Sequence, residues 1–346
     1  MLRRRNLLAG LAAGAFSCGR AATGAPPEGT ASPAPPGSAT VPGPGPAASS
    51  AVTARPVVPP APDLPASSAP ALPSPRVDTR RIDFEPTSDG PEAAVLVVPG
   101  WGAPGERFPV LVALHGQGEA RKGLEAGAWG WVRDYGLDRA MARLREPPLT
   151  AEDFQGFFDP KRLERINASL AARPFRGLVV ACPYTPDLLV VKSLNNAKVF
   201  GAFVTQQLLP RVVAEAPALA EPAATGIDGV SLGGRVALRV GLARAERFGA
   251  VGSMQAAVQL AEAPELSRRA ARAMEMTPGL RLRLLSSDHD FYRGEIWALL
   301  GELTWAKVAH EHLVVPGPHD YPFNRGPGAI EMLLWHDRVL RGEPGL

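Results

Sequence analysis

The chain has 346 residues and a formal net charge of +3, and 45% of its residues are hydrophobic, which suffices for a large buried core. Three of its 37 basic residues lie in residues 1–17, which hold no acid, and the other 34 balance 34 acidic residues. The sequence therefore gives no electrostatic reason to expect nucleic-acid binding. Two cysteines are too few for a disulfide framework or a cysteine-based metal site. Cys182, inside an apolar run, is expected to be a small core residue.

Residues 1–18 have the pattern of an export signal. Three arginines precede the short apolar run Leu7–Phe16, and small residues then lead to Cys18. The run is shorter than a membrane-spanning helix requires. The paired arginines followed by Asn-Leu-Leu resemble a twin-arginine signal, and the residues ending at Cys18 resemble a bacterial lipobox. We expect a periplasmic or cell-envelope protein with Cys18 lipidated, or, as the alternative, an ordinary signal cleaved nearby.

The next segment, residues 19–76, is expected to be a disordered tether. Residues 20–76 hold 16 of the 37 prolines, with few aromatic residues and no apolar periodicity. Such a composition cannot bury enough apolar surface to offset the entropy of ordering. A single α/β domain is expected over residues 77–346.

Eight segments of that domain are expected to be strands. Most are apolar without alternation, which suits strands that are buried on both faces of a parallel sheet. Helical patterns follow most of the later strands, and this alternation predicts a doubly wound α/β fold. The strands are Arg81–Glu85, Ala93–Val98, Pro109–Leu114, Leu178–Cys182, Thr225–Val230, Gly249–Ser253, Leu282–Leu285 and Glu311–Val315, and the helices are Leu194–Glu215, Gly233–Arg247, Glu265–Met276, Arg293–Val308 and Ile330–Leu340.

The turn His115-Gly116-Gln117-Gly118 follows the third strand. A turn of this kind after an early strand supplies a backbone N–H to an oxyanion hole. We predict Gln117 as the donor and a structural role for His115, with a plain glycine turn as the alternative.

Residues 119–176 are too long for one crossover helix and are rich in aromatic residues. Long loops in compact domains are often functional, so part of the segment is expected to cap the carboxyl edge of the sheet. The alternative is a helix pair with an aromatic core face. Trp129 and Trp131 are accordingly candidates for a substrate-binding wall or for the core.

The segment Gly229-Val230-Ser231-Leu232-Gly233-Gly234 matches the nucleophile elbow G-x-S-x-G. A strand precedes it and a helical pattern follows, which is the context the motif requires. The glycines allow strand and helix to approach closely. We predict Ser231 as the nucleophile and the Leu232 amide as the second oxyanion donor; the alternative is a non-catalytic glycine turn.

The general base is predicted to be His319, in the loop that follows the last strand. His336 falls inside a helical pattern and is expected to be a surface or core histidine. The acid should follow the strand Leu282–Leu285, where Asp290 is favoured over Asp288 because aromatic residues behind it would shield a His–Asp hydrogen bond.

Together, the H-G-x-G turn, the elbow, the Asp-bearing loop and the Pro-Gly-Pro-His loop resemble the α/β-hydrolase superfamily over residues 93–342. The branch they resemble is similar to esterase D and feruloyl esterases. The resemblance implies a mostly parallel sheet of about eight strands and cofactor-free hydrolysis through an acyl-enzyme. It also implies the triad of Ser231, Asp290 and His319, with Gln117 and Leu232 at the oxyanion positions.

We therefore expect a serine hydrolase that cleaves small carboxylic esters without cofactor or metal and meets a membrane only through a lipid anchor. Acyl transfer or peptide cleavage by the same triad is one alternative. A non-catalytic binding protein on this scaffold is another, and it would lack a triad member. His310 and His312 alternate at the start of a strand but have no further ligand cluster around them.

Overall fold

The computed structural model describes residues 75–88, 90–188 and 197–346. The predicted export signal with Cys18, almost all of the predicted tether, and the first residues of the helix predicted from Leu194 lie outside the described residues. The chain divides into two compact units, of which residues 68–346 form the second. Within the described ranges, no helix is long and apolar enough to cross a membrane.

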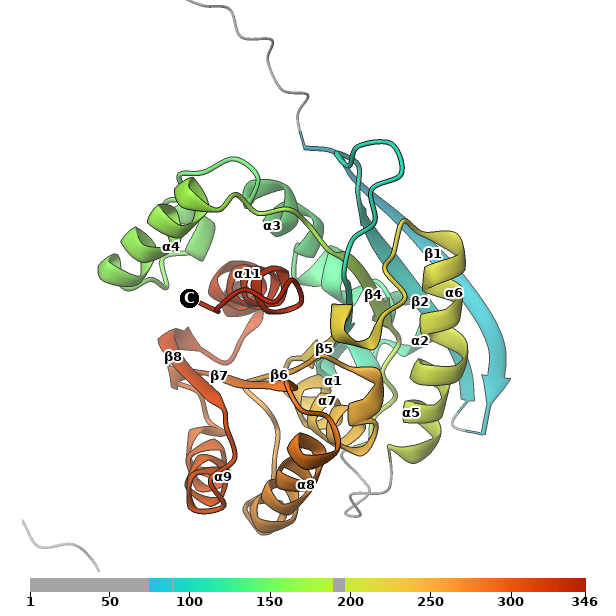
Figure 1. Cartoon of the computed structure of the whole chain (residues 1–346), viewed down its shortest axis with the longest axis vertical. Helices are drawn as coiled ribbons and strands as arrows, with labels where there is room; N and C mark the ends of the chain where they lie inside the picture. The colour runs from blue at the N-terminus through green and yellow to red at the C-terminus, as the bar shows by residue number, and fades with distance from the viewer. Residues whose placement is uncertain (1–74, 89, 189–196) are drawn as a thin grey trace, which may run out of the picture. The chain divides into compact units, whose positions relative to one another are not determined.

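An eight-stranded sheet organises this unit, as the sequence predicts (Figure 1). The strands lie in the order β1-β2-β4-β3-β5-β6-β7-β8. β2 is antiparallel to both β1 and β4, and the other neighbours are parallel. The carboxyl ends of β3 and β5–β8 therefore share one edge. The bounds are β1 Val77–Thr87, β2 Gly90–Pro99, β3 Val110–Leu114, β4 Val179–Pro183, β5 Thr225–Gly229, β6 Ala250–Met254, β7 Arg281–His289 and β8 Glu311–Pro318.

Helices cover both faces of the sheet, which explains the unbroken apolar runs in its central strands. In β3, Val112 and Leu114 belong to the core beneath one helical layer, and Leu111 and Ala113 belong to the core beneath the other. The first layer contains α5 Lys198–Phe203, α6 Leu209–Glu215, α7 Leu232–Ala243, α8 Ala263–Met276 and α9 Arg293–Trp305; the second contains α3 Leu137–Arg143, α4 Pro160–Ala172 and α11 Ala329–Val339 (Figure 1).

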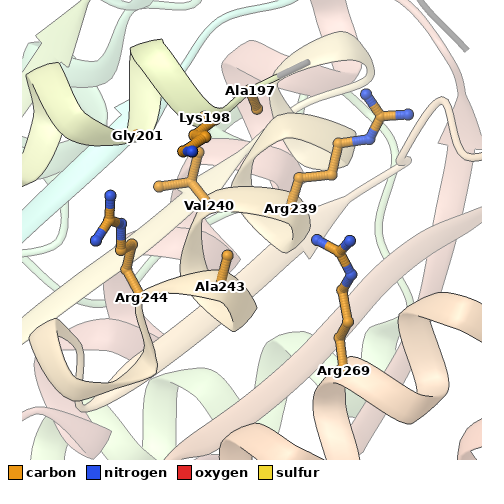
Figure 2. Close-up of a pocket in the computed structure, with 8 residues that line it drawn as sticks. All are labelled: Ala197, Lys198, Gly201, Arg239, Val240, Ala243, Arg244 and Arg269. Atoms are coloured by element: carbon orange, nitrogen blue, oxygen red, sulfur yellow. The ribbon is translucent and has the colours of Figure 1, made fainter. Parts of the chain in front are cut away.

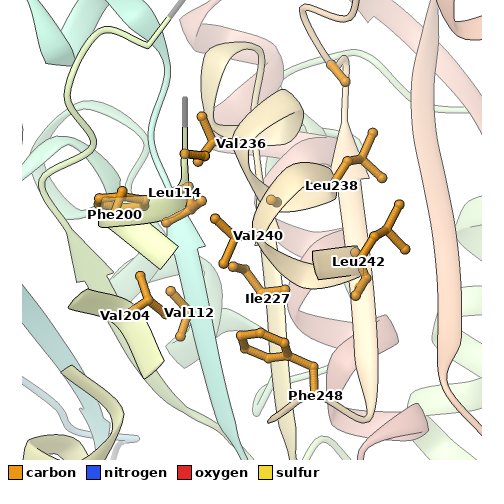
Figure 3. Packing of buried hydrophobic residues seen from close by; sticks show 14 of the residues in the cluster. Val112, Leu114, Phe200, Val204, Ile227, Val236, Leu238, Val240, Leu242 and Phe248 are labelled. Atoms are coloured by element: carbon orange, nitrogen blue, oxygen red, sulfur yellow. The ribbon is translucent and has the colours of Figure 1, made fainter. Parts of the chain in front are cut away.

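Helix α7 is the central helix of the first layer and is buried along nearly its whole length. Val236 and Val240 of α7 lie in the same cluster as Ile227 of β5 and Phe200 of α5 (Figure 3). Ser231 immediately precedes the first residue of α7. Burial of the helix on all sides therefore fixes the position of Ser231.

The segment 119–176 forms several short helices and α4. Trp131, Tyr135 and Phe154 are buried in the core of the second layer, and Trp129 packs against it. The structure therefore favours the aromatic core face over the cap for these residues. The short helices there and near the carboxyl end are α1 Gln117–Ala120, α2 Gly123–Gly127 and α10 Tyr321–Phe323.

Candidate active site

Ser231 sits on a strained bend between β5 and α7. Its backbone has φ 58° and ψ −115°, a conformation that non-glycine residues rarely adopt. The bend also needs the glycines around it. A Cβ on Gly233 would lie 2.2 Å from the carbonyl oxygen of Leu114, and one on Gly229 would lie 2.5 Å from the carbonyl carbon of Gly233. These contacts account for the G-x-S-x-G spacing.

Backbone hydrogen bonds hold the bend from two sides. The Ser231 amide donates to the carbonyl of Met254, at the end of β6, over 2.9 Å. The Ser231 carbonyl accepts from the Ala257 amide over 2.9 Å and from the Arg235 amide over 3.0 Å. The serine is partly exposed although its flanking residues are buried. Its hydroxyl is thus carried by a fixed backbone.

The two predicted oxyanion donors begin the helices after neighbouring strands. Gln117 is the first residue of α1, and Leu232 is the first residue of α7. Amides in the first turn of a helix have no acceptor within the helix. Because Leu114 of β3 pairs with Gly229 of β5, the two turns lie side by side. A Cβ on Gly116 would lie 3.8 Å from Ser231 Cβ.

His115 has the structural role that the sequence predicts. Its imidazole is buried, and Nε2 accepts a hydrogen bond from the Thr185 amide over 2.9 Å. Nδ1 lies 3.0 Å from the Gly116 carbonyl oxygen, so Nδ1 carries the proton and the ring is neutral. Burial lowers the pKa of His115 below its ordinary value. The ring therefore ties the end of β3 to the residues after β4.

Asp290 and His319 come together after β7 and β8. His319 Nδ1 lies 2.8 Å from Asp290 Oδ1, and the two side chains are 10% and 0% exposed. The carboxylate is oriented by the Ser286 hydroxyl, 3.0 Å from Oδ2, and by the Tyr292 amide, 3.0 Å from Oδ1. Since Nδ1 faces the carboxylate, Nε2 is the nitrogen left to accept a proton.

Asp288, the other acid candidate, has a different role. Its Oδ1 accepts a hydrogen bond from the Gly317 amide over 2.9 Å and lies 2.8 Å from His289 Nδ1. Its side chain is 45% exposed. It thus supports the loop that carries His319 without contacting the imidazole.

Gln255 links the elbow to the His319 loop, and sequence reasoning missed it. Its Nε2 donates to the Pro318 carbonyl over 3.0 Å and to Ser287 Oγ over 2.7 Å. It directly follows Met254, whose carbonyl binds the Ser231 amide. Among the described residues, no hydrogen bond joins Ser231 to His319. Catalytic hydrogen bonds are often long or poorly aligned in unliganded active sites and tighten only when the substrate binds. The sequence signal that could have identified Gln255 is a polar residue at the end of a central strand.

Aromatic rings surround the imidazole. Phe291 stacks on His319 with ring centroids 4.2 Å apart, and Tyr292 meets the imidazole edge-on at 5.6 Å. Phe291 is 67% exposed, so it also faces solvent beside the imidazole. The expected aromatic shield behind Asp290 is therefore present.

The two tryptophans predicted as substrate-binding candidates do not form an open wall. Trp131 is 0% exposed, so the expectation that it lines such a wall is corrected: its indole is part of the core. Trp129 is half-buried and its ring is covered by the Arg133 guanidinium at 4.5 Å.

The other predicted histidine roles fall outside this site. His336 is fully buried, with Nε2 3.0 Å from Asp228 Oδ2, so of the two expected positions, surface or core, it takes the core. His310 Nδ1 lies 2.8 Å from the Val308 carbonyl oxygen, and His312 packs edge-on against Trp297. In the part of the chain that the structure describes, no group of three His, Cys, Asp or Glu residues could hold a metal ion.

A cavity of about 280 Å³ lies elsewhere, between α5, α7 and α8 (Figure 2). Glu262 and Glu265 already pair with Arg239 and Arg269 of its lining. The cavity borders the C-terminal half of α7, whereas Ser231 precedes its first residue, so the cavity is separate from the Ser231 site. Its lining consists of Ala197, Lys198, Gly201, Arg239, Val240, Ala243, Arg244 and Arg269.

Comparisons with known proteins show which proteins this chain resembles. The family model described as putative esterase matches residues 187–309, which include Ser231 and Asp290. A search of curated protein sequences gives no match.

Several solved structures share the fold at low identity. The S-formylglutathione hydrolase from Staphylococcus aureus matches with 13% identity and a TM-score of 0.53, covering 77% of this chain and 98% of that chain. A ferulic acid esterase matches with 14% identity and a TM-score of 0.56, covering 76% and 99%. A mutant of the feruloyl esterase module from Clostridium thermocellum, complexed with sinapinate, has 12% identity and a TM-score of 0.52, covering 77% and 91%.

The sheet order and these similarities show that the chain has the α/β-hydrolase fold. Within that fold, residues 187–309 resemble the putative esterase family, whose model they match.

Proposed function

We propose that the chain hydrolyses carboxylic esters through the triad Ser231, His319 and Asp290. Ser231 Oγ attacks the ester carbonyl while His319 Nε2 takes the hydroxyl proton. The proton then passes to the departing alcohol, which leaves an acyl-enzyme on Ser231. Water, deprotonated by the same imidazole, releases the acid and restores the serine. Asp290 orients the ring and stabilises the imidazolium.

The amides of Gln117 and Leu232 receive the negative charge that develops on the carbonyl oxygen. Each preorganised donor of this kind contributes about 2.7–4 kcal/mol to the transition state. Their neighbouring helix starts, beside Ser231, support this assignment. The Gln117 side chain is engaged elsewhere, because its Nε2 donates to Asp187 Oδ2 over 2.8 Å.

The single observation that carries the proposal is the buried 2.8 Å contact between His319 Nδ1 and Asp290 Oδ1. It joins loops after two different strands, at the sheet edge where the strained serine also lies. A structural serine would need neither the strained φ nor an oriented imidazole on the same edge.

Hydrolysis of short- and long-chain p-nitrophenyl esters tests the proposal. We expect turnover by the wild type, loss of at least about 10³-fold in kcat for Ser231→Ala, and wild-type rates for Ser267→Ala, a buried serine on α8 that bonds the Glu302 carbonyl. Full activity in Ser231→Ala would overturn the mechanism. An acyl-serine adduct at residue 231, detected by mass spectrometry after rapid quenching, would support the acyl-enzyme.

Esters with an aromatic acyl group are the substrates that we propose. Phe291 offers an exposed ring beside the base, and structural neighbours include ferulic acid esterases and a feruloyl esterase complexed with sinapinate. Phe291→Ala should raise KM for a feruloyl ester several-fold more than KM for p-nitrophenyl acetate, because stacking contributes about 0.5–1.5 kcal/mol. Equal changes for both esters would contradict this substrate class.

We also propose that the chain is exported and anchored through Cys18. The arginine-rich start, the short apolar run and the lipobox-like residues support this. Metabolic labelling with palmitate should modify the wild type and spare Cys18→Ala. Equal labelling of both would contradict lipidation at this residue.

A further inference from the structure

A buried carboxylate beneath the oxyanion turn contacts side chains from two distant segments. Glu119 follows the turn on α1 and is 1% exposed. Its Oε2 accepts a hydrogen bond from the Tyr135 hydroxyl, and its Oε1 accepts one from the Tyr321 hydroxyl over 2.7 Å. Tyr321 lies two residues after His319. The one carboxylate, carried by the helix that begins at Gln117, therefore contacts Tyr135 and the residues that follow His319.

Each tyrosine also borders the turn itself. The Gly116 amide donates to the Tyr135 hydroxyl oxygen over 3.3 Å. A Cβ on Gly118 would lie 2.8 Å from the Tyr321 hydroxyl. Gln117, the proposed donor, lies between these two glycines. The three side chains thus border the residues on both sides of the amide that would hold the oxyanion.

Local backbone makes room for this carboxylate. A Cβ on Gly130 would lie 2.4 Å from Glu119 Cγ, and one on Gly127 would lie 2.4 Å from the Glu119 carbonyl oxygen. Lys122 Nζ, 3.5 Å from Oε1 and 2.8 Å from Asp134 Oδ2, supplies a neighbouring positive charge. Burial and Glu119 raise the pKa of both tyrosines, so their hydroxyls stay protonated and donate to the carboxylate.

We propose that Glu119 is a positioning residue that fixes the Gln117 oxyanion donor relative to the His319 loop, through hydrogen bonds from Tyr135 and Tyr321. The inference rests on the proposed function and deepens it. An oxyanion donor contributes fully only when its amide is held within a fraction of an ångström of the developing charge. Gly116 and Gly118, the glycines on either side of Gln117, both contact this network. Loosening the network would therefore shift the Gln117 amide. The resulting loss of stabilisation would be larger for the transition state than for the bound substrate, because the negative charge develops only in the transition state.

Steady-state kinetics of Glu119→Gln and Tyr321→Phe test the proposal. Each substitution keeps the size of the side chain and removes one or both charge-assisted hydrogen bonds. We expect kcat to fall about tenfold or more with KM within about twofold, because the loss concerns the transition state. Tyr321 is 37% exposed, so its variant carries little folding risk.

Glu331→Gln is the matched control for burial. Glu331 is also 1% exposed, and it forms a buried ion pair with Arg162 away from the turn, at 2.6 Å. Both glutamine variants should lower the melting temperature, but only Glu119→Gln should lower kcat. If both variants lose stability and both keep wild-type kcat, Glu119 is structural only and the proposal is overturned.

A double-mutant cycle separates positioning from substrate contact. If Tyr321 acts through Glu119, the kcat losses of Glu119→Gln and Tyr321→Phe combine to much less than their product. Multiplying losses, or a Tyr321→Phe effect on KM alone, would assign Tyr321 to the substrate and overturn the network. The failure of the mechanism itself is distinguishable, because it requires an active Ser231→Ala variant, whereas this inference fails when Ser231→Ala is inactive and Glu119→Gln retains full kcat.

Discussion

At the scale of single residues, two carboxylates only two positions apart differ in their burial and in their contacts. Asp290 is buried and contacts the imidazole of His319, whereas Asp288 is half-exposed and binds the Gly317 amide. Both lie near the carboxyl end of β7, where the strand ends and the chain turns toward α9. Side-chain direction at that turn, which composition does not reveal, decides which of the two carboxylates reaches His319.

The different contacts of the two carboxylates predict different kinetic consequences. Asp290→Asn should lower kcat about 10⁴-fold, because a neutral amide no longer fixes the imidazole tautomer or stabilises the imidazolium. Asp288→Asn should lower kcat by less than about tenfold, since it perturbs only a loop hydrogen bond. The measurement is p-nitrophenyl ester turnover by both purified variants. Similar losses in both variants would argue against Asp290 as the acid.

At the scale of elements, strand, bend and helix around Ser231 form one close-packed unit. β5 supplies Gly229, α7 supplies Gly233, and both would clash if they carried a Cβ. The same close approach places the start of α7 beside the turn after β3. The spacing of the motif is therefore a packing requirement of two elements as much as a chemical one.

Alanine substitutions of two helical glycines test this requirement. Gly233→Ala should destabilise the fold by about 3 kcal/mol or more, because the new Cβ would meet the Leu114 carbonyl oxygen at 2.2 Å. Gly301→Ala, in α9, meets nothing within 4 Å and should stabilise the fold by about 0.5–1 kcal/mol. Urea unfolding measures both values. A neutral Gly233→Ala would contradict the tight elbow.

At the scale of the whole molecule, two imidazoles are buried in the neutral form, one directly after β3 and one in α11. His115 accepts the Thr185 amide after β4, and His336 of α11 packs against Asp228 of β5. Burial lowers the pKa of both below the ordinary value of 6.5. The unfolded chain therefore binds protons at a pH where the folded chain does not.

This difference predicts a loss of stability in acid. The contribution of the two imidazoles is fully present above about pH 6.5 and decreases as the pH falls from there toward the folded pKa values. Urea unfolding at pH 8 and pH 5.5 should show the decrease, and His336→Gln should reduce it. His289→Gln, whose side chain is 79% exposed, is the control. Equal pH dependence in the wild type and His336→Gln would rule out this role for His336.

Much of the architecture was accessible from the sequence because it depends on local constraints. Continuous apolar runs indicated strands buried on two faces, and β3 contributes to both cores. The glycine spacing indicated the bend at Ser231, since steric limits on the backbone act over a few residues. The expected order of nucleophile, acid and base along the chain came from the resemblance to known hydrolases.

Contacts between distant residues were decided only by the tertiary structure. Trp131 was equally compatible with a substrate wall and with the core, and packing beneath the second helical layer placed it in the core. Glu119 meets Tyr321 across 202 positions, and Gln255 meets Pro318 across 63. Such pairs form because parallel strands bring their carboxyl ends to one edge. Which side chains meet there depends on register and burial, which no local pattern encodes.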